Sequence, residues 1–236
     1  MKTVLFDLDG TLLPMDQNVF MKAYFGGITK KLSPRGYEPK QLVDGIWRGT
    51  AAMVKNDGTK TNEQVFWAAF SRIFGEKAYS DIPYFDEFYK TDFNLIKNAC
   101  GFDRKAGETI KNLKSKGYKI IVATNPFFPM IAQQSRLQWA GIDLRDVDYI
   151  TSYENSRYCK PNILYYSEIM NVFGLDPRNC VMVGNDVTED MIAEKLGMRV
   201  FLMTRCLINK SNVNIDNYAH GGFDELSAFI DCEVAL

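Results

Sequence analysis

Residues 104–124 read RKAGETIKNLKSKGYKIIVAT and carry the plainest structural signal in the chain. The first part has the apolar spacing of an amphipathic helix. Gly117 follows it, and glycine readily adopts the left-handed conformation that ends many helices. The apolar run after Gly117 is typical of a buried strand. This stretch therefore predicts a helix, a glycine stop and a strand in immediate succession.

The same order recurs three more times toward the C-terminus. Predicted helices stop at Gly141, Gly174 and Gly197, and each is followed by an apolar run: VDYITS, NCVMVGN and MRVFLMT. With TVLF near the N-terminus, the chain has five predicted strands. Nearly continuous apolar strands that alternate with helices indicate a parallel sheet covered on both faces. The predicted fold is a doubly wound, Rossmann-like α/β core.

Residues 16–100 have a different character. They contain helical stretches rich in Phe, Tyr and Trp, and no comparable strand run. We therefore divide the chain into an α/β core, residues 1–15 and 101–236, and a smaller helical cap, residues 16–100. Because the cap follows the first strand directly, it is expected above the carboxyl end of that strand. We interpret its aromatic residues as the core of this helical domain rather than as a ligand site.

Composition narrows the functional classes. The 236 residues carry a formal net charge of −1, which gives no electrostatic case for nucleic acid or an acidic membrane. No apolar run is long enough to span a bilayer, and carboxylates interrupt the N-terminal apolar run, so we expect no secretory signal. Five cysteines without C-x-x-C spacing favour reduced thiols in a cytoplasmic protein. The single histidine, His220, is predicted in a loop, so a His-based zinc site or a Ser-His triad is disfavoured.

Polar side chains follow the predicted strands. Ligands of open parallel sheets bind beyond the carboxyl ends of the strands, so these side chains should face one site. They are Asp7, Asp9 and Thr11 after the first strand, Thr124 and Asn125 after the second, Lys160 after the third, and Asn185 and Asp186 after the fourth.

This set of side chains suits phosphate chemistry. Clustered carboxylates repel unless a cation neutralises them, and Mg²⁺ prefers oxygen ligands and substrate phosphate oxygens. A lysine and a hydroxyl can hold the remaining phosphate oxygens. One carboxylate can accept the phosphoryl group, and a second carboxyl two residues away can serve as acid and base. Gly10 lets the chain bend sharply after the strand.

The D-x-D-G-T sequence at residues 7–11 resembles the haloacid dehalogenase superfamily. The other strand ends follow in the same order as in that family, with a helical insertion after the first strand. The resemblance implies that Asp7 is the nucleophile and a metal ligand. It implies that Asp9 is the acid/base and ligates the metal through its backbone carbonyl. Thr124 would bind the phosphoryl group and Lys160 would stabilise it.

The resemblance covers residues 1 to about 16 and about 100 to 205. The candidate site residues after the first strand also have possible roles unrelated to catalysis. Thr11 and Asn125 are predicted as further phosphate contacts, but Thr124-Asn125 before a proline is also a common helix start. Lys160 is alternatively a solvated loop lysine. Asp190 is expected to orient Lys160, or else to be an acidic residue in the first turn of a helix.

The sequence departs from the family at the fourth strand. An aspartate usually follows the glycine there, but Asn185 follows Gly184 and Asp186 comes next. We predict Asp186 as the metal ligand. The alternative is Asn185, whose amide oxygen would bring one negative charge fewer.

The predicted function is magnesium-dependent hydrolysis of a small phosphorylated metabolite through an aspartyl phosphate, with no nucleic-acid or membrane partner. A dehalogenase of this family needs no metal and lacks the second aspartate, so Asp9 argues against dehalogenation. A phosphomutase or phosphotransferase would use the same core and would need a basic cap pocket. Arg48 and Lys55 are candidates for that pocket, or else solvated surface charges. The third alternative is a catalytically idle ligand-binding protein.

Overall fold

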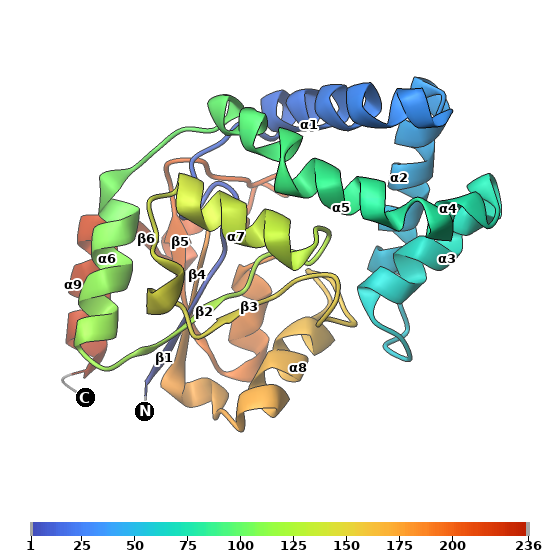
Figure 1. Cartoon of the computed structure of the whole chain (residues 1–236). Coiled ribbons are helices and arrows are strands. Elements are labelled where there is room, and N and C mark those ends of the chain that lie inside the picture. Colours follow the sequence, from blue (N-terminus) through green and yellow to red (C-terminus); the bar gives the residue numbers. More distant parts are fainter. Residues whose placement is uncertain (1, 235–236) are drawn as a thin grey trace.

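A computed structural model describes residues 2–234 (Figure 1). Within these residues, six parallel strands form one sheet in the order β3-β2-β1-β4-β5-β6. The strands are β1 (Thr3–Phe6), β2 (Lys119–Val122), β3 (Tyr149–Ile150), β4 (Cys180–Gly184), β5 (Arg199–Met203) and β6 (Ala219–Gly221).

The five predicted strands are present, and β6 is additional. The prediction of a loop at His220 was wrong, because this residue pairs with Leu202 at the edge of the sheet. A three-residue strand of moderate burial has no apolar run to reveal it.

Helices cover both faces of the sheet, as predicted. Val4 and Phe6 point into one apolar cluster and Leu5 into the other, because successive side chains of a strand alternate between faces. The first cluster contains α6 (Arg104–Ser115), α7 (Met130–Trp139) and α9 (Phe223–Val234). The second contains α8 (Ile163–Phe173) and the 3₁₀ segment η5 (Met191–Leu196). The chain is thus a doubly wound α/β protein.

The four glycines predicted to end helices all have positive φ. The last of the four helices is different in kind, since residues 191–196 form a 3₁₀ segment and not the predicted α-helix. Six residues is long for 3₁₀ structure, in which runs beyond three or four residues are uncommon.

Residues between β1 and α6 are helical and include no strand. They form α1 (Gln17–Leu32), a 3₁₀ turn η1 (Ser33–Arg35), α2 (Pro39–Val54), α3 (Asn62–Phe74), α4 (Lys77–Ser80), α5 (Ile82–Lys90) and the 3₁₀ segment η2 (Asp92–Ala99). We call residues 16–100 the helical segment. Figure 1 shows it beyond the carboxyl ends of the strands, which lie at the top of the sheet in that view.

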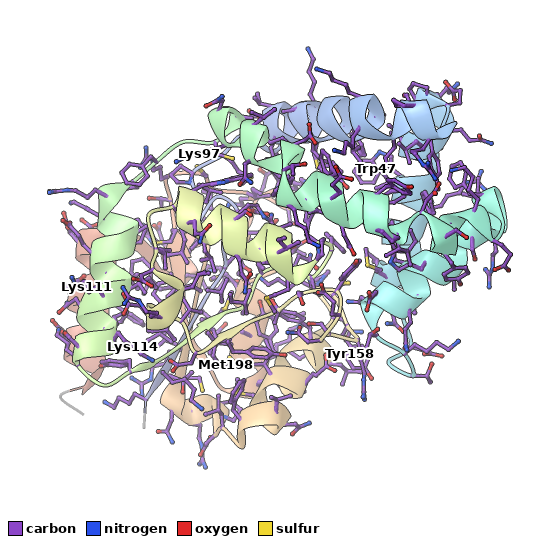
Figure 2. The ribbon with its side chains drawn as sticks, in the orientation of Figure 1. Trp47, Lys97, Lys111, Lys114, Tyr158 and Met198 are labelled. Atoms are coloured by element: carbon purple, nitrogen blue, oxygen red, sulfur yellow. The ribbon has the colours of Figure 1, made fainter. Side chains whose placement is uncertain are left out.

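Aromatic packing holds the helical segment together. Gly49 of α2 lies against the ring of Phe66 of α3, and a Cβ at Gly49 would come within 2.4 Å of that ring. Phe66 stacks on Phe70, with ring centroids 5.7 Å apart. The glycine therefore permits an approach of α2 to α3 that no larger residue allows. Trp47 of α2, labelled in Figure 2, is half-exposed, and its ring centroid lies 5.5 Å from that of Phe25.

Aromatic side chains of α1 and η2 pack against α7 and the loop before it, and backbone groups of the helical segment contact the core in two further places. Where the chain enters and leaves, Met15 pairs with Cys100 in an antiparallel bridge. At the start of α3, the Asn62 backbone N–H donates to the carbonyl oxygen of Ser156 at 2.8 Å. The second contact holds the segment against the loop that carries Lys160.

Candidate active site

Asp7 lies at the centre of the carboxyl edge of the sheet. Strand β1 is fully buried, and the Asp7 N–H continues its ladder by donating to Val183 O at 2.8 Å. The side chain faces two donors: Lys160 Nζ lies 2.9 Å from Oδ1, and Thr11 Oγ1 donates to Oδ2 at 3.1 Å. The carboxylate is thus held in one orientation where β1 meets its neighbours β2 and β4, the position at which doubly wound folds bind ligands.

The turn after Asp7 requires glycine. Gly10 has φ of +89°, and a Cβ there would lie 2.3 Å from Asn185 Nδ2. This close approach brings the Asn185 amide against the turn, with its Oδ1 3.0 Å from Thr11 Oγ1. The single Thr11 hydroxyl proton is shared between Asn185 Oδ1 and Asp7 Oδ2.

Lys160 is a buried lysine. Its side chain has no exposed surface, and Nζ lies 2.9 Å from Asp7 Oδ1 and 2.7 Å from Asp190 Oδ1. Burial alone would lower the pKa of Lys160, but the carboxylates of Asp190 and Asp7 raise that pKa well above its ordinary value. The alternative of a solvated loop lysine was therefore wrong. Asp190 contacts Lys160, as expected from the sequence.

Thr124 and Asn125 lie in the loop after β2, and α7 begins only at Met130, so the alternative of a helix start was wrong. The Thr124 carbonyl oxygen accepts hydrogen bonds from Thr151 Oγ1 at 2.7 Å and from the Tyr165 hydroxyl at 2.9 Å. Asn125 Nδ2 donates to Glu189 Oε2 at 2.9 Å. These bonds fix the loop beside Asp7.

The two residues after β4 have different surroundings. Asn185 is buried; its Nδ2 donates to Cys206 O at 2.7 Å, which directs Oδ1 toward Thr11. Asp186 Oδ1 accepts from the backbone N–H groups of Thr188 and Glu189, at 2.7 and 3.0 Å. Asn185 therefore directs its amide oxygen toward the Asp7 side of the site, whereas Asp186 holds the turn that follows.

The Asp9 side chain has a partner that the sequence analysis missed. Its Oδ2 accepts a hydrogen bond from Arg136 of α7, and Arg136 also bonds to Gln133. The Arg136 side chain has no exposed surface, and its guanidinium lies 4.5 Å from the ring centre of Phe128. Burial raises the pKa of Asp9, although the positive charge of Arg136 opposes that increase. The available signal was the arginine of QQSRLQWA, a charged residue on a predicted helix face that also carries Gln133 and apolar residues.

The donor set fits a hard cation such as Mg²⁺. Among residues 2–234 no three Asp, Glu, His or Cys side chains converge to hold an ion by themselves. Mg²⁺ does not need such a cage, because it binds one or two carboxylates and completes its shell with water and phosphate oxygens. Asp9 Oδ1 is buried without a hydrogen-bond partner in the described part of the chain. Lys160 and Arg136 contact Asp7 and Asp9 but are fully buried, so no described lysine or arginine side chain lines the cavity itself.

A cavity of about 270 Å³ extends from these residues into the helical segment. Asp7, Asp9, Thr124 and Asn185 contribute to one part of its wall. The remainder is largely aromatic, so several of the rings interpreted as packing residues also face the cavity. Arg48 and Lys55 are exposed and do not line the cavity. The suggestion that they form a basic pocket in the cap was therefore wrong, and the alternative that they are solvated surface charges is confirmed.

Comparisons with known proteins identify the family of this chain. Residues 1–195 match the family model of the haloacid dehalogenase-like hydrolases. The chain therefore belongs to this family, and the predicted family and hydrolase class are confirmed. Over 96 residues it is 36% identical to glyceraldehyde 3-phosphate phosphatase of Methanothermobacter thermautotrophicus. That match spans 40% of this chain and 41% of the relative.

Two solved structures share the fold along nearly their whole length. One is a predicted phosphoglycolate phosphatase from Haemophilus somnus, with a TM-score of 0.58, 19% identity and 98% of each chain covered. The other is a hydrolase of this family from Bacillus subtilis, described as bound to magnesium, with a TM-score of 0.53, 17% identity and 97% of each chain covered. In the part of this chain that the structure describes, no helix has the length and apolarity needed to cross a membrane.

Proposed function

We propose that this chain is a magnesium-dependent phosphohydrolase that cleaves a small-molecule phosphate monoester through an aspartyl phosphate at Asp7. The observation that carries the proposal is the Asp7 carboxylate on a cavity wall, held between the Lys160 ammonium at 2.9 Å and the Thr11 hydroxyl at 3.1 Å. The phosphatase names of related proteins support the same class of reaction.

In the first step, an Asp7 carboxylate oxygen attacks phosphorus. A bond from Asp7 to phosphorus forms, the ester P–O bond breaks, and Asp9 gives its proton to the departing alcohol oxygen. The raised pKa of Asp9 supports this role, since a buried carboxyl keeps its proton more readily near neutral pH.

In the second step, water attacks the phosphorus of the aspartyl phosphate. Asp9, now ionised, takes a proton from that water, and the bond between phosphorus and Asp7 breaks. Inorganic phosphate leaves, and both carboxyl groups return to their starting states. Asp7 as the nucleophile and Asp9 as first the acid and then the base thus account for the bond and proton changes of both half-reactions.

Lys160 and Thr124 would hold the transferring group. Lys160 carries a buried positive charge next to the attacking oxygen, where the low dielectric strengthens its effect on phosphoryl charge. Asp190 holds the ammonium at 2.7 Å and so positions it. We assign Thr11, Thr124 and Asn125 to the phosphoryl oxygens, since all three lie at this edge.

Mg²⁺ would be held by the Asp7 carboxylate, the Asp9 backbone carbonyl and a residue after β4. When bound, the ion neutralises phosphoryl charge that the carboxylate-rich wall would otherwise repel. The hydrogen bonds around Asn185 support its amide oxygen as the third protein ligand over the Asp186 carboxylate, which already accepts two backbone bonds.

We propose that residues 16–100 act as a cap over a core of residues 1–15 and 101–236. Aromatic side chains of the helical segment and carboxylates of the core line one cavity, which supports closure of the cap over substrate. Closure would exclude bulk water from the aspartyl phosphate.

The alternatives have less support. A phosphomutase must hold a second phosphate, but no described lysine or arginine side chain lines the cavity. A catalytically idle protein would be marked by loss of the nucleophile or the acid, and both Asp7 and Asp9 are present.

Hydrolysis of p-nitrophenyl phosphate tests the proposed function. We expect turnover with Mg²⁺, loss of turnover with EDTA, and recovery when Mg²⁺ is added in excess. Full activity in metal-free buffer, or none with Mg²⁺, would contradict the proposal.

A further inference from the structure

The cavity beyond the catalytic carboxylates has an unusual distribution of charge. Five of the described residues lining it are carboxylic acids, all from the core: Asp7, Asp9, Asp186, Glu189 and Asp190. The buried cations nearby are already paired, Lys160 with Asp7 and Asp190, and Arg136 with Asp9. A substrate with a second negative charge would therefore meet carboxylates at the core end of the cavity and no positive charge from the described residues along the rest of its wall.

Aromatic and aliphatic side chains form the far walls. Phe25, Phe66, Trp67 and Phe85 contribute rings from the helical segment, and Met21 and Ile46 contribute aliphatic surface. Such walls gain free energy by covering apolar surface and gain little from a hydroxylated surface.

The polar groups of these walls are few, and several already have partners, although Trp67 Nε1 is a buried donor without one among the described residues. The hydroxyls of Tyr24 and Tyr89 lie 2.9 Å apart and bond to each other. Thr50 donates to the Ile46 carbonyl oxygen at 3.0 Å. A polyhydroxylated substrate would lose its bonds to water and find few replacements, and each unmet polar group is costly.

We propose that the cavity binds the alcohol part of a phosphate monoester with an aromatic or aliphatic body and no second anionic group. This inference rests on the proposed phosphohydrolase function and narrows its substrate class. A volume of about 270 Å³ lies near the lower end of the range for small-molecule sites, which suits a body of modest size. Sugar phosphates, bisphosphates and phosphorylated carboxylic acids are therefore disfavoured.

A matched series of primary alkyl phosphates tests the proposal. In n-hexyl phosphate, glucose 6-phosphate and 6-phosphohexanoate, a six-carbon primary alcohol leaves in each case, so the compounds differ mainly in hydroxyl or carboxylate content. We expect kcat/KM for n-hexyl phosphate to exceed both others by about 30-fold or more. From ethyl to butyl to hexyl phosphate, kcat/KM should rise about threefold to fourfold per methylene until the cavity is full.

A charge placed in the wall gives an independent test. Met21 is half-buried on α1 and lines the cavity. Met21→Lys should reduce the preference for n-hexyl phosphate over 6-phosphohexanoate by about tenfold, because the ammonium provides a countercharge. Met21→Leu keeps the wall apolar and should keep the preference. Lys22→Met, at the exposed neighbouring position, should also leave it unchanged.

The outcomes separate this inference from the proposed function. If p-nitrophenyl phosphate is hydrolysed but glucose 6-phosphate or 6-phosphohexanoate matches n-hexyl phosphate, the apolar-substrate proposal is overturned and the phosphohydrolase stands. If no phosphate ester is hydrolysed, the function fails. In that case, isothermal titration calorimetry with the Asp7→Asn variant still tests whether the cavity prefers an apolar body. Tighter binding of n-hexyl phosphate than of glucose 6-phosphate supports the apolar site, and equal binding overturns it.

Discussion

The carboxyl edge of the sheet and the walls of the helical segment enclose one cavity, but they are built differently. At the sheet edge, short polar bonds fix each side chain, as in the contact of Lys160 with Asp7 and Asp190. In the helical segment, broad aromatic contacts such as Phe66 on Phe70 fill space without directional bonds. Directional contacts suit chemistry that needs fixed atoms, and shape-filling contacts suit recognition of an apolar body.

This difference implies separable effects of substitution. Changes at the edge should alter the chemical step for every phosphate ester. Changes in the walls, such as Met21→Lys, should alter the choice of ester while the chemical step is kept.

Asp7→Asn should abolish turnover of all phosphate esters, by about 1,000-fold or more, because an amide is a very poor nucleophile. Steady-state hydrolysis of p-nitrophenyl phosphate with Mg²⁺ measures the loss. Asp44→Asn, the same change at an exposed position of α2, should retain full activity. Substantial turnover by Asp7→Asn would remove Asp7 from the nucleophile role.

Asp9→Asn should lower kcat for alkyl phosphates by about 100-fold, since the departing alkoxide then leaves without a proton. The loss should be smaller for p-nitrophenyl phosphate, whose leaving group needs less protonation. Comparing kcat for the two ester types measures this difference. Equal losses would show that Asp9 does not act as the acid.

Arg136→Met should destabilise the protein by about 3 kcal/mol, because it removes one partner of a largely buried ion pair. Urea unfolding followed by circular dichroism measures the change. Arg145→Met is the matched control: Arg145 also pairs with an aspartate, Asp143, but its side chain is 89% exposed. Exposed pairs contribute little, so that variant should lose much less stability than Arg136→Met. Similar losses in the two variants would contradict a special role for burial at Arg136.

The pair after β4 should show the smallest effects. If Asn185 ligates the ion, Asn185→Asp adds a negative charge and should lower the Mg²⁺ concentration for half-maximal activity about tenfold. Asp186→Asn should change that concentration less, since its Oδ1 already accepts two backbone bonds. Magnesium titrations of both variants provide the measurement. If only Asp186→Asn sharply raises the Mg²⁺ concentration for half-maximal activity, Asp186 and not Asn185 is the metal ligand.

Many residues at the carboxyl edge of the sheet could be predicted because each one follows an apolar run that the sequence identifies as a strand. Asp7 directly follows a buried strand, and the parallel topology brings Thr124 and Lys160 to the same edge. Tertiary contacts were less accessible. Arg136 is adjacent to Asp9 only because α7 packs over the sheet, and 127 positions separate the two in the chain. The orientations of Asn185 and Asp186 likewise depend on the Cys206 carbonyl and the following turn.

The helical segment was predictable as helices but not as a cavity wall. The sequence indicates aromatic packing in this segment, and the structure contains it. The same rings also line the cavity because α1, α2, α3 and α5 meet beyond the carboxyl end of the sheet, and their relative placement depends on contacts such as Gly49 with Phe66. Periodicity in one helix carries no information about the distance to the next.

The covalent step at Asp7 is the central claim, and chemical trapping tests it most directly. The enzyme would be mixed with Mg²⁺ and p-nitrophenyl phosphate, quenched in acid within the first turnovers, reduced with borohydride and digested for mass spectrometry. An aspartyl phosphate is reduced to homoserine, whereas a free aspartate is not. We predict homoserine at position 7 and unchanged aspartate at Asp9 and Asp16. Turnover without any modification at Asp7, or with modification at Asp9 instead, would contradict the account.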